Sequence, residues 1–209
     1  MAGKKVAVAA GSGFEHRVWS TMKHLILESE AFRLSEDSGM KYIKSDGQHS
    51  AERRGLVFEG NYIRGFLCAQ NDFYNFMSQL LLGDVYSKDD QVSAKRRLQS
   101  ILSKNMLPDM AFFDYRNRSI TIVEMKTQTS GGSVDEKLET VHFKRKQYQK
   151  LAAAIDFGEV NFNWALDAKF DEPTYDDVKR YLTEMNSYFE VGTVSLELLS
   201  LHHTPEISG

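Results

Sequence analysis

The sequence predicts an α/β fold, in which a central mixed β-sheet carries helices on both faces. In the second half of the chain, apolar strand-like segments alternate with amphipathic helical segments in the order ββαβαβ, which is typical of such a sheet. Residues 119–126 place apolar side chains on both of their faces, as a buried central strand does. A helical stripe that includes Phe14, Val18 and Met22 precedes these segments and predicts a first covering helix.

Each expected element follows from its local pattern. Apolar residues at helical spacing predict helices over about 14–32, 68–82, 88–104, 134–156 and 174–189. Apolar segments bounded by polar turns predict strands over 109–115, 119–126, 160–166 and 193–201. Glycines punctuate the segment 35–65 and indicate irregular or short-strand structure there.

The length of 209 residues fits one domain over 1–209. Its expected core spans about 12–32 and 107–201, and a helical insertion of about 35–105 precedes the pair of strands that begins at 109. Hydrophobic residues make up 42% of the chain, as in an ordinary soluble protein. No run of about 18 apolar residues predicts a membrane span, and the first residues are too weakly apolar for a signal peptide.

Cysteine content and charge restrict the function classes further. Cys68 is the only cysteine, which excludes an internal disulfide and a cysteine-rich zinc site, and a reducing cytoplasm is the expected location. The net charge of −3 gives no general support to nucleic-acid binding. Local clusters such as Lys95-Arg96-Arg97 and Lys144-Arg145-Lys146 can nevertheless bind phosphates on an acidic protein.

Charged residues at the ends of the expected strands 109–115 and 119–126 are the main functional feature. Glu124 and Lys126 project from one face of their strand, and Met125 projects from the other. A hairpin joined by the polar turn 116–118 would bring Asp109 next to Glu124. Neighbouring carboxylates repel unless a cation joins them or one takes up a proton. A mutual ion pair with Lys126 is one means of compensation, and a Mg²⁺ site is the other.

A metal at this position would have a defined chemical use. Mg²⁺ shares phosphate oxygens with a substrate, lowers the pKa of a bound water and neutralises charge that builds up on a phosphate. Lys126 would orient or deprotonate that water, with its own pKa lowered by the metal and by burial.

Pro108-Asp109, a gap of hairpin length and then Glu124-Met125-Lys126 resemble the signature of the PD-(D/E)XK nuclease superfamily. The resemblance implies a restriction-endonuclease-like fold with Asp109, Glu124 and Lys126 as catalytic residues. It further implies that Asp109, Glu124 and Met125 contribute to a divalent-metal site and that Lys126 assists the attacking water. The stretch Phe14-Glu15-His16-Arg17-Val18 is similar to the first core helix of many such enzymes, which implies that Glu15 is a further metal or water ligand. A capping box formed by Ser12 and Glu15 is the alternative.

The resemblance also implies an activity and partners. The expected function is that of a type II restriction endonuclease, which cuts double-stranded DNA at a specific sequence with Mg²⁺. Mn²⁺ would substitute, and Ca²⁺ would bind without supporting turnover. A homodimer would match palindromic sites, the insertion 35–105 would hold the dimer interface or base-reading elements, and a cognate DNA methyltransferase would belong to the same system. The alternatives are a structure-specific nuclease similar to junction resolvases, a non-catalytic DNA-binding subunit, and a structural ion pair without nuclease activity.

The loop after the Glu124–Lys126 strand is a candidate phosphate-binding segment. Ser130, Gly131, Gly132 and Ser133 precede a helix start near Val134. Free backbone N–H groups at a helix start, next to glycines that allow close approach, suit a phosphate oxygen. Lys137 and Lys144 would extend this contact, and an ordinary loop followed by a solvated helix is the alternative.

Overall fold

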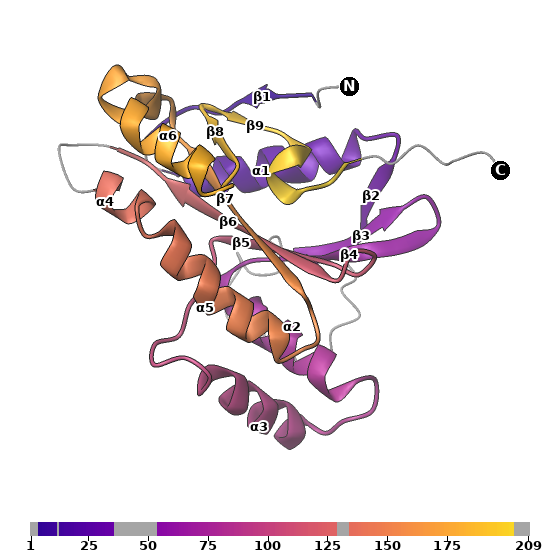
Figure 1. Ribbon diagram of the computed structural model, residues 1–209. Coiled ribbons are helices and arrows are strands. Elements are labelled where there is room, and N and C mark those ends of the chain that lie inside the picture. The colour runs from indigo at the N-terminus through magenta and orange to yellow at the C-terminus, as the bar shows by residue number, and fades with distance from the viewer. Residues whose placement is uncertain (1–3, 12, 36–53, 129–133, 203–209) are drawn as a thin grey trace.

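The computed structural model describes residues 4–11, 13–35, 54–128 and 134–202. Within these ranges the main sheet has seven strands in the order β2-β3-β4-β5-β6-β7-β8 (Figure 1). Their bounds are β2 (Phe32–Ser35), β3 (Arg54–Glu59), β4 (Tyr62–Cys68), β5 (Met110–Asp114), β6 (Ser119–Lys126), β7 (Glu159–Leu166) and β8 (Phe189–Val191). Neighbours from β2 to β6 are antiparallel, and β6, β7 and β8 are parallel. The expected mixed sheet of an α/β protein is therefore confirmed.

Helices cover both faces of this sheet and bury two separate apolar clusters (Figure 1). The cluster on one face includes residues of α2 (Gln70–Leu82), α4 (Val134–Leu138), α5 (Val141–Ala153) and α6 (Asp176–Glu184). Helix α3 (Lys88–Gln99) packs on α2 and adds Leu98 to this cluster. The other face packs against α1 (Phe14–Leu27) and the 3-10 helix η4 (Leu196–Leu199). Two short strands, β1 (Val6–Ala7) and β9 (Thr193–Val194), pair beside η4. No helix in the described ranges is long and apolar enough to cross a membrane.

Strand β6 lies in the interior of the sheet, between β5 and β7. Ile120 and Ile122 contribute to the cluster on the α5 side, whereas Val123 and Met125 contribute to the cluster on the α1 side. Burial on both faces explains why the sequence pattern predicted this strand with its observed bounds of 119 and 126. The end of β6 is consequently held in place from both sides of the sheet.

The sequence predicted irregular or short-strand structure over 35–65 within an insertion. Residues 54–68 form strands β3 and β4 of the main sheet, so the assignment of this segment to an insertion is wrong. Strand β4 pairs directly with β5, so this segment supports the hairpin that carries Asp109 and Glu124. Glycines weakened the strand pattern in the sequence, yet close pairing requires one of them. A Cβ added to Gly65 would lie 2.1 Å from the carbonyl oxygen of Phe113 on β5.

Several expected bounds also differ from the structure. The first helix ends at Leu27, and the helix expected over 134–156 is interrupted between α4 and α5. The helix expected over 174–189 ends at Glu184, and β8 follows. The strand expected over 193–201 is reduced to β9, and η4 follows with Leu198 and Leu199 buried. Two consecutive buried leucines fit a tight helical turn, because a strand would send them to opposite faces.

Candidate active site

The start of β5 and the end of β6 position the candidate catalytic residues. Asp109 directly precedes β5, and the register pairs Met110 with Val123. Asp109 therefore lies across from Glu124, as the hairpin predicted. The indole N–H of Trp19 on α1 donates to the carbonyl oxygen of Asp109 at 3.2 Å, which ties this end of the hairpin to the helix on the other face.

Lys126 connects the two carboxylates. Its Nζ lies 3.0 Å from Oε2 of Glu124, 3.3 Å from Oδ2 of Asp109 and 2.9 Å from the carbonyl oxygen of Met125. The main-chain N–H of Met125 donates to the same Oδ2 of Asp109 at 2.8 Å. The three residues that the sequence pattern singled out are thus in direct contact, with a main-chain donor and a main-chain acceptor between them.

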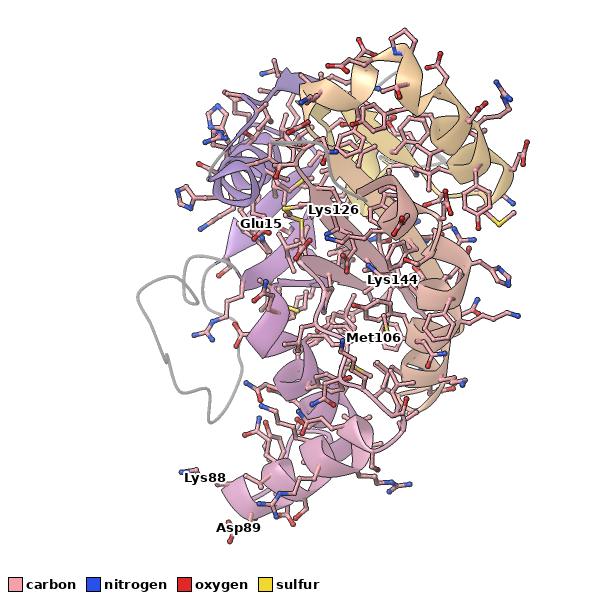
Figure 2. All side chains as sticks on the ribbon, turned by 90° about the vertical axis from the view of Figure 1, so that its left-hand side faces the viewer. Glu15, Lys88, Asp89, Met106, Lys126 and Lys144 are labelled. Atoms are coloured by element: carbon pink, nitrogen blue, oxygen red, sulfur yellow. The ribbon has the colours of Figure 1, made fainter. Side chains whose placement is uncertain are left out.

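A second lysine reaches the site from α5. Nζ of Lys144 lies 3.2 Å from Oε2 of Glu124, the oxygen that also accepts from Lys126. Figure 2 shows Lys126 at the end of β6 and Lys144 on the neighbouring helix. The sequence placed Lys144 among phosphate-binding residues and did not predict its contact with Glu124. Its position one turn before the buried Tyr148 was the available signal, because residues four apart share a helix face.

Neighbouring charges determine the direction in which the pKa of Lys126 shifts, although its side chain is only 20% exposed. Burial by itself lowers the pKa of this ammonium group, but the charges of Glu124 and Asp109 outweigh burial and raise it. The lowered pKa was expected for a site that holds a metal, whereas the two carboxylates by themselves raise the pKa of Lys126. Its ammonium group lies between both acids and compensates their charge.

Aromatic side chains form the wall of the site on the α5 side. Trp164 is paired with Glu124 across β6 and β7, and its ring lies 5.4 Å from Nζ of Lys144 and 6.0 Å from Nζ of Lys126. The Tyr148 hydroxyl and the Trp164 indole N–H are buried and have no hydrogen-bond partner among the described residues. Burial, followed by the charge of Glu124, raises the pKa of Tyr148. The sequence pattern identified Tyr148 only as a core residue and did not single out Trp164.

Glu15 lies in the first turn of α1 and is exposed. Trp19, which bonds to Asp109, follows one turn later on the same side of this helix, so that side of α1 is directed toward the start of β5. The N-cap of α1 is Gly13, and Ser12 of the alternative capping box lies outside the described residues.

The candidate phosphate-binding loop, with Ser130, Gly131, Gly132 and Ser133, lies outside the described residues. The helix that follows starts at Val134, as expected, but it is only five residues long. Lys137 is exposed on this helix, and Lys144 points to Glu124 instead.

The donor atoms suit a hard divalent cation. Asp109, Glu124 and Met125 offer two carboxylates and one main-chain oxygen, and Mg²⁺ typically takes one or two carboxylates and completes its shell with water and phosphate oxygens. The contacts of Asp109 and Glu124 with Lys126 use Oδ2 and Oε2, and not Oδ1 and Oε1. The Asp109 side chain is 14% exposed, whereas Glu124 is buried. Among the described residues, no three His, Cys, Asp or Glu side chains gather as a metal-binding group.

The site thus consists of two carboxylates, two ammonium groups and a main-chain oxygen at one end of a buried strand pair. Comparisons with protein-family models, with curated proteins and with solved structures find no match for this chain.

Proposed function

We propose that this chain is a Mg²⁺-dependent endonuclease with a restriction-endonuclease-like fold, which hydrolyses double-stranded DNA at a specific sequence. One observation carries the proposal. Asp109 and Glu124 meet at the end of the β5–β6 hairpin, where both carboxylates lie within 3.3 Å of the Lys126 ammonium group. Paired carboxylates with an adjacent lysine suit metal-assisted attack of water on a phosphodiester.

Asp109 and Glu124 would hold the metal ion through their carboxylates, and Met125 would add its main-chain oxygen. Mg²⁺ bound there supplies charge neutralisation at a phosphate and lowers the pKa of a coordinated water. Mn²⁺ is expected to replace it, and Ca²⁺ is expected to bind without turnover. Glu15 remains the candidate for a further metal or water ligand from α1.

Lys126 is suited to donate hydrogen bonds in this reaction. In the described arrangement the two carboxylates raise the pKa of its ammonium group, which favours the protonated form. A protonated lysine at this position can orient a water molecule or neutralise a phosphate oxygen, whereas removal of a proton from water would first require its own deprotonation. Loss of the ammonium group in Lys126→Ala should therefore abolish cleavage.

A structural role of the same charges is the competing interpretation. Lys126 and Lys144 compensate the two acids within the chain, and a buried ion-pair network needs no substrate. The two interpretations differ in metal binding. Calorimetry should detect Mg²⁺ or Ca²⁺ binding that disappears in Asp109→Ala, whereas a purely structural network would bind neither ion.

Cleavage of DNA is the direct test of the proposed activity. The purified protein is incubated with plasmid and phage DNA of known sequence, with and without Mg²⁺, beside Lys126→Ala and Lys150→Ala. Lys150 lies on α5, is exposed and lies outside the basic clusters, so its variant controls for the loss of one positive charge. We expect discrete bands that require Mg²⁺, persist in Lys150→Ala and disappear in Lys126→Ala.

Other outcomes would redirect the proposal. Cleavage of branched DNA alone would identify a structure-specific nuclease instead of a restriction enzyme. If unmodified, modified and branched DNA all remain intact under conditions in which the protein binds Mg²⁺, the proposal of nuclease activity is wrong.

A further inference from the structure

We infer that Lys144 competes with a divalent cation for Glu124, so that Lys144 leaves this carboxylate when the metal binds. The inference rests on the proposed function, because it concerns the control of the same site. It assigns to Lys144 a role distinct from that of Lys126, although both lysines contact the same carboxylate oxygen.

The charge balance of the site is the first argument. Asp109 and Glu124 contribute two formal negative charges, and Lys126 and Lys144 contribute two positive charges. The four groups are joined by ion pairs of 3.0 to 3.3 Å and are all at most about a quarter exposed. The site is therefore neutral without a metal, and a divalent cation would give it a charge of +2 in a partly buried position. Release of one ammonium group relieves this excess.

The number of contacts indicates which lysine leaves. Nζ of Lys126 has three acceptors, on Asp109, Glu124 and Met125. Nζ of Lys144 has one hydrogen-bond acceptor among the described residues, Oε2 of Glu124 at 3.2 Å. Lys144 also extends from a helix, whereas Lys126 belongs to the strand that bears Glu124. Repulsion by a nearby cation therefore displaces Lys144 at a lower cost in free energy than it would displace Lys126.

The aromatic wall explains how Lys144 can move without losing all stabilisation. Its Nζ already lies 5.4 Å from the centre of the Trp164 ring and 5.9 Å from the centre of the Phe162 ring. Such ring faces attract an ammonium group. Lys144 is 24% exposed, so its released ammonium group can also regain water.

Calorimetric titration with Ca²⁺ tests the competition without any need for turnover. Binding effects between two ligands of one site are reciprocal, so removal of Lys144 must tighten metal binding if metal binding expels Lys144. We expect Lys144→Met to bind Ca²⁺ at least about fivefold more tightly than the wild type, within the usual range of such coupling. Lys146→Met is the matched control, because it removes one positive charge from an exposed position on the same helix.

Chemical labelling of the wild type gives a second readout that does not depend on a folded variant. Lysines are acetylated under limiting reagent with and without Ca²⁺, and each site is quantified by mass spectrometry. We expect modification of Lys144 to rise when Ca²⁺ is added, while modification of Lys146 stays constant. Circular dichroism and thermal unfolding verify that Lys144→Met is folded.

The outcomes separate the inference from the proposed function. If Ca²⁺ binding depends on Asp109 but Lys144→Met binds no more tightly than Lys146→Met, or binds more weakly, the competition is refuted and the metal site stands. Unchanged labelling of Lys144 at saturating Ca²⁺ would refute it as well. If neither the wild type nor Lys144→Met binds Ca²⁺ or Mg²⁺, both the inference and the proposed metal site fail.

Discussion

The carboxylate of Asp109 and the main-chain N–H of Met125 connect the two strands of the hairpin beyond their last residue pair. Oδ2 of Asp109 accepts from Met125 at 2.8 Å, and Met110 and Val123 form the last pair of the register. One oxygen of Asp109 therefore completes the strand pairing, while Oδ1 is not used in this contact. The same side chain can stabilise the hairpin and bind a ligand.

Substitutions of Asp109 should separate these two roles. Asp109→Asn retains an acceptor oxygen for Met125, whereas Asp109→Ala leaves a buried main-chain donor without a partner, at a cost of about 1–3 kcal/mol. We expect Asp109→Ala to be less stable than Asp109→Asn in urea unfolding, and both variants to lose Ca²⁺ binding. Equal stability of the two variants would show that the bond to Met125 contributes little.

A second prediction concerns the buried ion-pair network at the opposite end of β5. Nε and Nη2 of Arg64 donate to the two carboxylate oxygens of Asp114 at 3.1 and 2.7 Å, and Nη1 donates to Glu59 at 2.7 Å. The Arg64 side chain is 4% exposed, whereas that of Arg116, which also pairs with Glu59, is 57% exposed. Arg64→Met would leave Asp114 buried without its cation.

Removal of one partner of a buried pair typically costs about 3–5 kcal/mol, and exposed pairs contribute about 0–1 kcal/mol. We therefore expect Arg64→Met to lower the free energy of unfolding by several kcal/mol and Arg116→Met to change it little. Chemical denaturation of both variants measures the difference. Similar small effects would mean that water replaces the guanidinium group of Arg64.

Hydrophobic patterning predicted the part of the fold that surrounds the candidate site. Strand β6 is buried on both faces, and its apolar residues therefore defined its bounds in the sequence. The proximity of Asp109 and Glu124 followed from the geometry of an antiparallel hairpin, since a short turn leaves little freedom of register. Local sequence was sufficient here because the relevant contacts are local.

Features that depend on contacts distant in sequence were not predicted. Strands β3 and β4 contain Gly55 and Gly65, which allow the neighbouring backbones to approach closely. Local strand propensity does not indicate such close pairing. The contact between Lys144 and Glu124 depends on how α5 is oriented about its own axis and on where this helix lies over β6 and β7. Packing of the whole cluster on that face determines both.

A third prediction tests the role of Gly65 in sheet pairing. A Cβ at this position would lie 2.1 Å from the carbonyl oxygen of Phe113 and 2.8 Å from Cζ of Phe112. Gly65→Ala would force β4 and β5 apart, and we expect it to destabilise the protein by about 3 kcal/mol or more. Gly158→Ala is the control, because a Cβ added there would have no described atom within 4 Å and the backbone does not adopt a positive φ. Thermal unfolding of both variants measures the contrast, and equal stability would contradict the tight pairing of β4 and β5.

A fourth prediction concerns the pH dependence of stability through Asp72. This carboxylate is buried in the first turn of α2, and its Oδ2 lies 3.3 Å from Nη1 of Arg54. Burial raises the pKa of Asp72 by more than the charge of Arg54 lowers it. An unfolded aspartate has a pKa of about 3.9, so between these two pKa values the folded state binds more protons than the unfolded state.

The stability that protonated Asp72 contributes is therefore fully present below about pH 3.9 and is lost as the pH rises through the folded-state pKa. Chemical denaturation of the wild type and of Asp72→Asn across this range isolates the effect. We expect the wild type to lose stability relative to Asp72→Asn as the pH rises, and the difference to level off above the folded-state pKa. Arg54→Met should extend this loss of stability to higher pH, because it removes the charge that lowers the pKa of Asp72. A difference that grows in the opposite direction would show that Arg54 outweighs burial.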